Sequence, residues 1–343
     1  MLQLALTALA LTAGPTPISR ADADVAISTL MVRHDPLLHW ARQLLPPDRA
    51  RAASALYAWC RRLDEIVDAP GADPSATTYA LDDWQARLDE LWSGSPRDAF
   101  DGALLETLRA HPTLGREPFE AMLAGMRDDA ASGARRYQSF RPELLEYAYC
   151  VAGTVGEMLI PVLGLDGEAA ENGESGEGGE GGEEMAEAAI ALGCAVQLLN
   201  IARDVRTDLL ERDRIYLPRE DALRCGLTAP ELEGAIRDGA FDARFRRLVR
   251  LQSRRATALL RRAARALPRM RRGQALLVAV LIELHHALND ELQARDFDSI
   301  SLGDDRVRVP TARKVLLTVT TAASVLLRGP AAHYAASEAA RQR

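Results

Sequence analysis

The sequence has almost no lysine and few aromatic residues. Lys314 is the only lysine among 42 basic residues, and aromatic residues make up 5% of the 343-residue chain. Alanine, leucine and arginine dominate instead. These three lose little conformational freedom in a helix, whereas residues that favour strands are scarce. The composition therefore predicts an all-α protein, long enough for one large or two modest domains.

A strong charge of one sign is also missing from most of the chain. The formal net charge is −7, but residues 171–184 contribute six glutamates and no cation, so the remainder is nearly neutral. A nearly neutral surface lacks the electrostatic footprint of a nucleic-acid-binding protein. No nucleic acid is therefore expected as a partner, and any site for an anionic ligand must be local.

Cysteine pairs at metal-binding spacing are absent as well. Cys60, Cys150, Cys194 and Cys225 include no CxxC pair and no histidine partner at zinc-ligand spacing. Each lies in an apolar stretch with helical periodicity. This pattern predicts buried free thiols and argues against a disulfide framework or a zinc site.

No apolar run is long enough by itself to predict a transmembrane helix. The short run 2–13 resembles the core of a signal peptide, but no basic residues precede it. Residues 1–21 are therefore either a targeting segment or a disordered N-terminus, and the sequence leaves both interpretations open.

Apolar residues recur at three- and four-residue spacing through most of the chain, which is typical of amphipathic helices. The predicted helices span residues 23–33, 38–45, 47–67, 77–93, 98–111, 117–131, 142–163, 187–208, 242–266, 271–294 and 311–327. The acidic, glycine-rich residues 166–186 are predicted to form a surface loop, because they cannot bury enough apolar area to order themselves. The loop is inserted in one helical domain, residues 22–330, and residues 331–343 follow as a tail.

Two aspartates lie about one helical turn apart in the predicted helix 47–67. Asp64 and Asp68 project from the same face, and Arg61 and Tyr57 extend that stripe. Carboxylates at this spacing repel one another unless a cation lies between them, and Mg²⁺ prefers carboxylate, phosphate and water oxygens. An isolated pair of this kind is more often a solvated helix end, so the interpretation depends on a second motif.

A second polar stripe runs along a later predicted helix. Gln197, Asn200, Asp204 and Asp208 lie on one continuous face within an otherwise apolar stretch. A solvent face would carry more numerous and more varied charges, and a core face would be apolar. Arg203 adds a cation that suits a phosphate. Two facing helices with paired carboxylates would hold several divalent cations around a diphosphate.

Together these stretches resemble the two aspartate-rich motifs of the squalene and phytoene synthases. The pattern LGxxxQxxNIxRDVxxD followed by RIYLP is highly specific, and residues 147–164 resemble another signature of that family. In this third stretch Gly153 and Gly156 would let helix backbones and a polyprenyl chain approach closely. The likeness covers nearly all of the chain from about Leu38 onward, apart from the acidic loop. The pieces CRRLDEIVD and DRIYLPRE are most similar to phytoene synthases of plants and photosynthetic microbes.

The resemblance implies a single-domain isoprenoid synthase of class I, a helical bundle around a central apolar cavity. The implied ligands of Mg²⁺, with Mn²⁺ as an alternative metal, are Asp64, Asp68, Asn200, Asp204 and Asp208. The implied contacts of the diphosphates are Arg61, Gln197, Arg203, His285 and Arg306. The implied catalytic residues are the four aspartates together with Tyr57 and Tyr147, which match positions that line the cavity.

The sequence departs from the family pattern at several positions. Where the family has a flap over one diphosphate, residues 35–38 differ and only His34 is retained. Asp35 places a negative charge where phosphate oxygens are expected. His285 stands where a tyrosine is usual, and Cys150 where a second aromatic residue is common. These changes leave the metal-binding carboxylates intact and bear on substrate affinity and activity.

The implied reaction joins two geranylgeranyl diphosphates head to head into phytoene through a cyclopropyl (prephytoene) diphosphate, the first step of carotenoid biosynthesis, without NADPH. One alternative is a squalene-type synthase that acts on farnesyl diphosphate with NADPH. Another is a family member retained as an assembly or scaffold factor, against which the four correctly spaced aspartates argue. The same resemblance implies a plastid location, peripheral contact with a membrane and other carotenoid enzymes as partners.

Overall fold

The structure, a computed structural model, describes residues 20–34, 38–39, 42–68, 73–130, 137–164, 180–301 and 306–341. Within these residues the chain is helical, with a single bridge residue at Ile215 and no strand, which confirms the predicted all-α class. Most of the N-terminal segment 1–21, the flap residues 35–37 and most of the acidic loop lie outside the described residues.

The helices of the first half of the chain are α2 (Arg20–His34), α4 (Pro47–Val67), α5 (Pro74–Trp92), α6 (Ala99–Ala110), α7 (Glu117–Ala130), α8 (Leu145–Ala148) and α9 (Thr154–Leu163). Those of the second half are α10 (Glu180–Arg212), α11 (Arg219–Arg224), α12 (Ala229–Asp238), α13 (Ala243–Ala264), α14 (Arg272–Ala294), α15 (Thr311–Arg328) and α16 (Pro330–Arg341). The short helical turns are the 3₁₀-helices η1 (Arg42–Leu44) and η4 (Leu267–Arg269) and the π-helices η2 (Phe140–Leu144) and η3 (Tyr149–Gly153).

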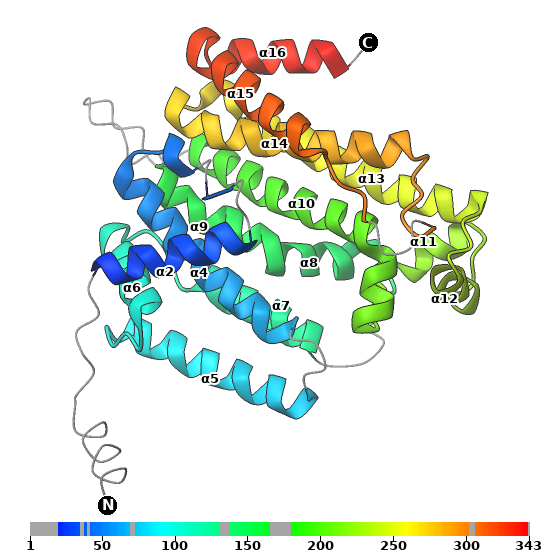
Figure 1. Cartoon of the computed structure of the whole chain (residues 1–343), viewed down its shortest axis with the longest axis horizontal. Helices are drawn as coiled ribbons and strands as arrows, with labels where there is room; N and C mark the ends of the chain where they lie inside the picture. The colour runs from blue at the N-terminus through cyan, green and yellow to red at the C-terminus, as the bar shows by residue number, and fades with distance from the viewer. Residues whose placement is uncertain are drawn as a thin grey trace, which may run out of the picture.

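Helix α10 lies at the centre of the bundle (Figure 1). It packs against α13 on one side and against η3 and α9 on the other, and α14 packs against α13 and carries α15. On the far side of α9, α4 joins the bundle to α2, α5, α6 and α7. Helices α4 and α10, which carry the two aspartate motifs, therefore belong to one packed body.

The central position of α10 follows from its composition. Ala195, Leu198, Leu199 and Ala202 are completely buried, so the helix is apolar on more than one side. By length and composition Gly182–Arg212 is apolar enough to span a membrane, contrary to the expectation that no stretch qualifies, but 56% of its most apolar window is buried in the bundle. Its hydrophobicity is that of a core helix.

Small residues let α10 and the preceding segment approach each other closely. A Cβ at Gly193 would overlap the backbone carbonyl of Ala152, and a Cβ at Gly156 would overlap that of Ala189. Glycine is required at both positions because any larger residue would push the two helices apart. The interpretation of Gly156 as a site of close backbone approach is thus confirmed.

The ends of several helices differ from the prediction. Helix α10 begins at Glu180, so residues 180–186, predicted as part of the loop, form its first turns. Within the predicted helix 38–45, residues 38–39 are helical and residues 42–44 form the 3₁₀ turn η1. The predicted helix 142–163 is interrupted by the π-helical turns η2 and η3. These differences are local and leave the order of the long helices unchanged.

Residues 331–343, predicted as a tail, mostly belong to α16, which packs against α14, α15 and η4. Its sequence is rich in alanine, a strong helix former, and it buries His333. The short helices α11 and α12 were also not predicted. Each is too short for its periodicity to stand out from the surrounding loop, although α12 carries a capping box between Thr228 and Glu231.

All four cysteines are free, as predicted, but the predicted burial holds for only two of them. Cys194 and Cys225 are buried, and Cys60 and Cys150 are half-buried. Burial raises the pKa of Cys60 to about 12, so this thiol stays protonated at neutral pH.

Candidate active site

The first aspartate motif lies at the C-terminal end of α4. The helix starts with Pro47, where no backbone N–H is needed, and ends at Asp68, whose backbone N–H donates to the carbonyl of Asp64 at 3.0 Å. The Arg61 Nη1 atom donates to Asp64 Oδ2 at 2.7 Å. His34, at the end of α2, pairs with Glu65 at 2.9 Å. The retained flap histidine therefore lies next to this motif.

The second motif lies along α10, as its spacing predicts. Asp204 and Asp208 are both buried, with 8% of each residue exposed, and Asn200 is half-buried on the same face. Arg203 Nε donates to Asp204 Oδ1 at 2.8 Å, and Arg306 Nε lies 3.8 Å from the same oxygen. Two arginines predicted to bind diphosphate are thus placed beside one aspartate predicted to bind metal.

Arg212 joins the two motifs. It lies in the last turn of α10, where its Nη2 donates to Asp68 Oδ2 at 3.1 Å and its Nη1 donates to Asp208 Oδ1 at 3.2 Å. Arg214 Nη1 lies 3.6 Å from Asp68 Oδ1. The aspartates of α4 and α10 therefore face one another across a gap that arginine side chains fill, and the predicted convergence of the two motifs is observed.

Burial, and a like charge on the same helix, raise the pKa of one carboxylate in each motif. Burial, followed by the like charge of Asp68, raises the pKa of Asp64 to about 6. Burial, followed by the like charge of Asp204, raises the pKa of Asp208 to about 7. The cations of Arg61 and Arg212 oppose these shifts without cancelling them.

The donor set of the motifs suits a hard divalent cation, because it consists of carboxylate and amide oxygens. Among the described residues, however, no three acidic, histidine or cysteine side chains stand close enough together to hold a metal ion. The arginines account for this, since Arg61 engages Asp64 and Arg212 spreads between Asp68 and Asp208. A cation bound by these oxygens would have to replace the guanidinium groups.

A buried cluster of tyrosines around Asp129 adjoins the motifs, and the sequence did not predict Asp129 or Tyr216 as part of the site. Asp129, in the last turn of α7, accepts hydrogen bonds from Tyr147 Oη at 2.8 Å and from Tyr216 Oη at 3.0 Å. The two phenol rings stack at 5.2 Å, and Tyr137 lies 5.4 Å from Tyr147. Burial raises the pKa of both Asp129 and Tyr147.

The local backbone explains how Arg214 and Tyr216 reach this cluster. Asp213 adopts a left-handed conformation at φ 52° and ends α10, and the Arg214 N–H returns to the Asp208 carbonyl at 2.9 Å. The turned chain then brings Arg214 Nη2 to the Asp129 backbone carbonyl at 3.0 Å. The only sequence signal for these residues was their position in the RIYLP motif. No sequence signal pointed to Asp129, because it lies in α7, which carries neither aspartate motif.

Two further predicted residues lie on α4 and α14. Tyr57, on α4, packs against the small apolar cluster that α2 contributes, which includes Ile27 and Met31. His285, on α14, places its Nδ1 2.7 Å from the carbonyl oxygen of Leu281. Burial lowers the pKa of His285, with a smaller contribution from Arg203.

An apolar cavity of about 290 Å³ lies beside the second motif. Its polar edge includes Arg203 and His285, two of the predicted diphosphate contacts, and Lys314 of α15. Its apolar wall consists mainly of residues of α14: Leu277, Val280, Leu281, Leu284 and Leu288. A lining that combines cationic groups with aliphatic side chains suits a ligand that has an anionic head and a hydrocarbon chain.

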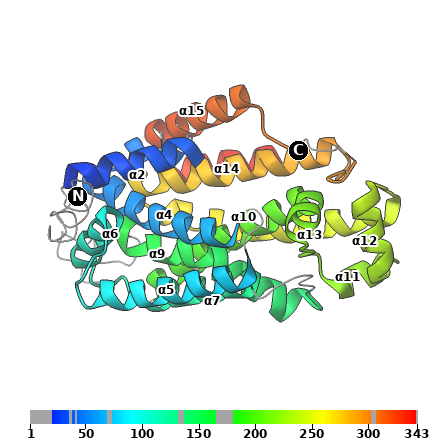
Figure 2. The same ribbon diagram turned by 60° about the horizontal axis from the view of Figure 1, so that its bottom comes forward.

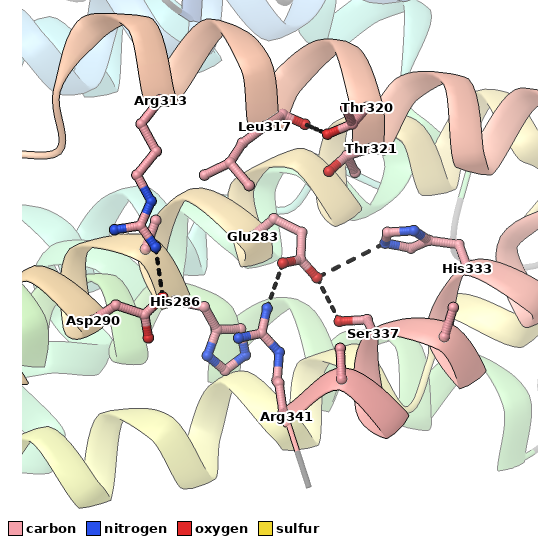
Figure 3. Close-up of a pocket in the computed structure, with 13 residues that line it drawn as sticks. Glu283, His286, Asp290, Arg313, Leu317, Thr320, Thr321, His333, Ser337 and Arg341 are labelled. Atoms are coloured by element: carbon pink, nitrogen blue, oxygen red, sulfur yellow. Dashed lines mark hydrogen bonds and ion pairs between the residues drawn. The ribbon is translucent and has the colours of Figure 1, made fainter. Parts of the chain in front are cut away.

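A larger cavity, of about 490 Å³, lies between α14, α15 and α16 (Figure 3). Its charged groups pair with one another: Glu283 accepts from Ser337 Oγ at 2.6 Å and from Arg341, and Asp290 accepts from Arg313 at 2.8 Å. None of the predicted site residues lines it. Arg203 and His285 line the smaller cavity, so the smaller cavity is the one that adjoins the candidate active site.

The same all-helical fold is found in solved structures of other proteins. It is similar to the crystal structure of a dehydrosqualene synthase, with a TM-score of 0.73 at 24% identity over 90% of this chain and 98% of the other. It is also similar to a squalene synthase from Alicyclobacillus acidocaldarius, with a TM-score of 0.68 at 22% identity over 82% and 97% of the two chains.

The sequence comparisons identify the family. Residues 31–313 match the squalene/phytoene synthase family profile, and the chain belongs to this family of prenyltransferases. It is 39% identical to the 15-cis-phytoene synthase of Synechocystis sp. over 80% of this chain and 76% of that protein. It is 36% identical to the chloroplastic phytoene synthase of an Oncidium hybrid cultivar over 80% of this chain and 61% of that protein. The chain thus spans less than two thirds of such plant relatives.

Proposed function

We propose that the protein condenses two geranylgeranyl diphosphates head to head into phytoene, through a cyclopropyl (prephytoene) diphosphate. The observation that carries this proposal is the meeting of Asp64 and Asp68 on α4 with Asp204 and Asp208 on α10 around arginine side chains. The identity of 36 to 39% with proteins named phytoene synthase supports phytoene as the product.

Each part of the site has a role in this reaction. The oxygens of Asp64, Asp68, Asn200, Asp204 and Asp208 would hold Mg²⁺, with Mn²⁺ as an alternative. The bound cation would supply positive charge that draws a diphosphate away from its allylic carbon. Arg61, Gln197, Arg203, Arg306 and His285 would bind the diphosphate oxygens, as charge-assisted hydrogen bonds from arginine to phosphate are short and strong.

The carbon chemistry needs a dry environment rather than a further reactive group. The C–O bond of the first substrate breaks to an allylic cation. The double bond of the second substrate attacks this cation, and loss of a proton from the newly joined carbon closes the cyclopropane. The second diphosphate then leaves, the skeleton rearranges and a proton is lost, with no reductant. The aliphatic walls contributed by Leu277, Val280 and Leu284 would keep water from the cations.

The rival activity is a squalene-type reaction on farnesyl diphosphate with NADPH. Purified protein should be incubated with each labelled substrate and Mg²⁺, with and without NADPH, and the lipid extract analysed. Phytoene formed from geranylgeranyl diphosphate alone supports the proposal, whereas squalene formed only with NADPH supports the rival. A product that persists in Asp64→Ala or Asp204→Ala would contradict catalysis at these motifs, and no product from either substrate would favour a scaffold role.

The location and partners are proposed on the same basis. The plant relatives carry the description chloroplastic, which supports a plastid location. The substrate and product have long hydrocarbon chains, so we propose peripheral contact with a membrane and transfer to other carotenoid enzymes. Fractionation of plastids into soluble and membrane fractions tests this placement.

A further inference from the structure

Helix α15 exposes an unusual amount of apolar surface. Five of the large apolar side chains that are exposed among the described residues lie on this helix: Val315, Leu316, Val319, Leu326 and Leu327. Leu316 is 62% exposed and Leu327 is 81% exposed. Single exposed apolar residues are normal on protein surfaces, but a continuous row along one helix marks an interaction site.

These residues share one face of α15. Together with the exposed Ala312, Thr320 and Ala323, they recur at three- and four-residue intervals, so they form a stripe of more than four turns without a charge. Figure 2 shows α15 as the outermost helix on its side of the bundle. The stripe therefore faces away from the protein.

The opposite face holds α15 firmly on the bundle. Thr318, Thr321 and Val325 are buried, and Arg313 donates to Asp290 at 2.8 Å and to Glu291 at 2.7 Å on α14. The exposed stripe is thus not the result of a detached helix. It belongs to a helix whose position is set by its inner face.

The charges at the ends of α15 indicate the kind of surface that the stripe meets. Arg328 lies exposed at its end, and the helix contains no acidic residue. An apolar helix face that carries no charge, on a helix whose only ionisable side chains are basic, is typical of helices that lie in the headgroup region of an anionic bilayer. The helix is oriented along the protein surface, which suits contact with a membrane plane.

The start of the stripe adjoins the cavity of the candidate active site. Lys314 lines that cavity together with Arg203 and His285. We propose that the outward face of α15 inserts into the headgroup region of an anionic lipid bilayer and so places the cavity next to the membrane. A prenyl chain could then pass between the bilayer and the cavity without crossing water. The passage of substrate rests on the proposed function, whereas the membrane contact stands on α15 alone.

The test is flotation of the full chain with vesicles of phosphatidylcholine, with and without phosphatidylglycerol. The double substitution Leu316→Glu and Leu327→Glu should lower the vesicle-bound fraction roughly tenfold or more, because it places two charges in the apolar layer. The matched control is Tyr79→Glu on α5, since Tyr79 is 77% exposed but lies on the opposite side of the bundle (Figure 1). This control should bind as the unchanged protein does.

A second variant tests the contribution of the basic residue at the C-terminal end of α15. Arg328→Glu should reduce binding to vesicles with phosphatidylglycerol by about fivefold or more and leave binding to pure phosphatidylcholine nearly unchanged. Unchanged circular dichroism and melting curves show that each variant is folded.

Three results would overturn the proposal: no flotation of the unchanged protein, equal flotation of the α15 double variant, or a dimer in light scattering that the double variant splits. The last would assign the stripe to a second copy of the chain. Turnover in detergent micelles separates the two proposals, because the α15 double variant should remain as active there as the unchanged protein. If the unchanged protein and the double variant are both inactive in micelles while the unchanged protein still floats with vesicles, the proposed reaction is rejected and the membrane contact stands.

Discussion

Asp68 and Asp208, on helices α4 and α10, accept hydrogen bonds from the same guanidinium group, that of Arg212, at 3.1 and 3.2 Å. This arginine holds together two carboxylates that would otherwise repel each other. It also occupies the gap between the two motifs, where a divalent cation would bind in the proposed reaction. Arg212 and the cation therefore compete for the same oxygens.

Replacing Arg212 should make the protein depend more strongly on Mg²⁺. In Arg212→Gln, the loss of two charge-assisted hydrogen bonds should lower the free energy of unfolding by about 1 to 3 kcal/mol without metal. Added Mg²⁺ should then raise the melting temperature more in the variant than in the unchanged protein. Thermal denaturation with and without Mg²⁺ measures this difference. Arg237→Gln serves as the control, because Arg237 pairs with Asp213 and Glu233 at the surface. Equal shifts in all three proteins would mean that Arg212 does not compete with the cation.

The contribution of Asp208 to the stability of the metal-free protein should fall as the pH rises from about 4 to about 7. Asp208 has a raised pKa of about 7 in the folded protein, against an ordinary value of 3.8, so this group binds more protons in the folded state than in the unfolded state between these values. Its contribution to stability therefore falls with rising pH in this window and is greatest below it. Asp64 contributes in the same direction up to about pH 6, but less, because its side chain is more exposed.

Melting temperatures of the unchanged protein and of Asp208→Asn across this pH range check the effect. The variant cannot ionise at this position, so the melting temperature of the unchanged protein should fall relative to that of the variant as the pH rises. Mg²⁺ should reduce this relative fall, because a bound cation stabilises the ionised carboxylates. A constant difference between the two melting temperatures from pH 4 to pH 7 without metal would contradict the assignment.

Removing the hydroxyl of Tyr216 should destabilise the cluster around Asp129. Tyr216→Phe leaves the buried Asp129 carboxylate with one hydrogen-bond donor fewer, at an expected loss of about 1 to 3 kcal/mol in the free energy of unfolding. Urea denaturation measures this loss. Tyr149→Phe is the matched control, because Tyr149 donates to Glu157 in a half-buried place where water can replace the lost partner. A loss no larger than that of the control would mean that Asp129 does not depend on the tyrosines.

Adding a methyl group at Gly193, where α10 meets η3, should destabilise the protein. Gly193→Ala would press a Cβ into the Ala152 carbonyl, and the shift of the helices should lower the free energy of unfolding by about 1 to 3 kcal/mol. Gly234→Ala on α12 has open space around it and should be neutral or stabilising by up to about 1 kcal/mol, because alanine favours the helix. Chemical denaturation of both variants provides the comparison. Equal stability of the two variants would exclude close packing at Gly193.

Much of the candidate site could be predicted from the sequence because it depends on helical periodicity. The spacing of Asp64 and Asp68, and that of Asp204 and Asp208, places each pair on one face of its helix whatever surrounds it. The pairing of Arg203 with Asp204 is equally local. The residues missed, Asp129, Arg212 and Tyr216, take part through contacts between different segments, which no local spacing encodes.

The sequence by itself determined the all-helical composition, the two carboxylate stripes and the family to which they belong. These properties follow from residue preferences and from a repeat of 3.6 residues, which act over a few turns. Only the tertiary structure decided that Arg212 bridges Asp68 and Asp208, that two phenols hold Asp129 and that α15 turns an uncharged face outward. Such relations depend on which helices pack together, and packing is set by the shape of the whole core rather than by any one segment.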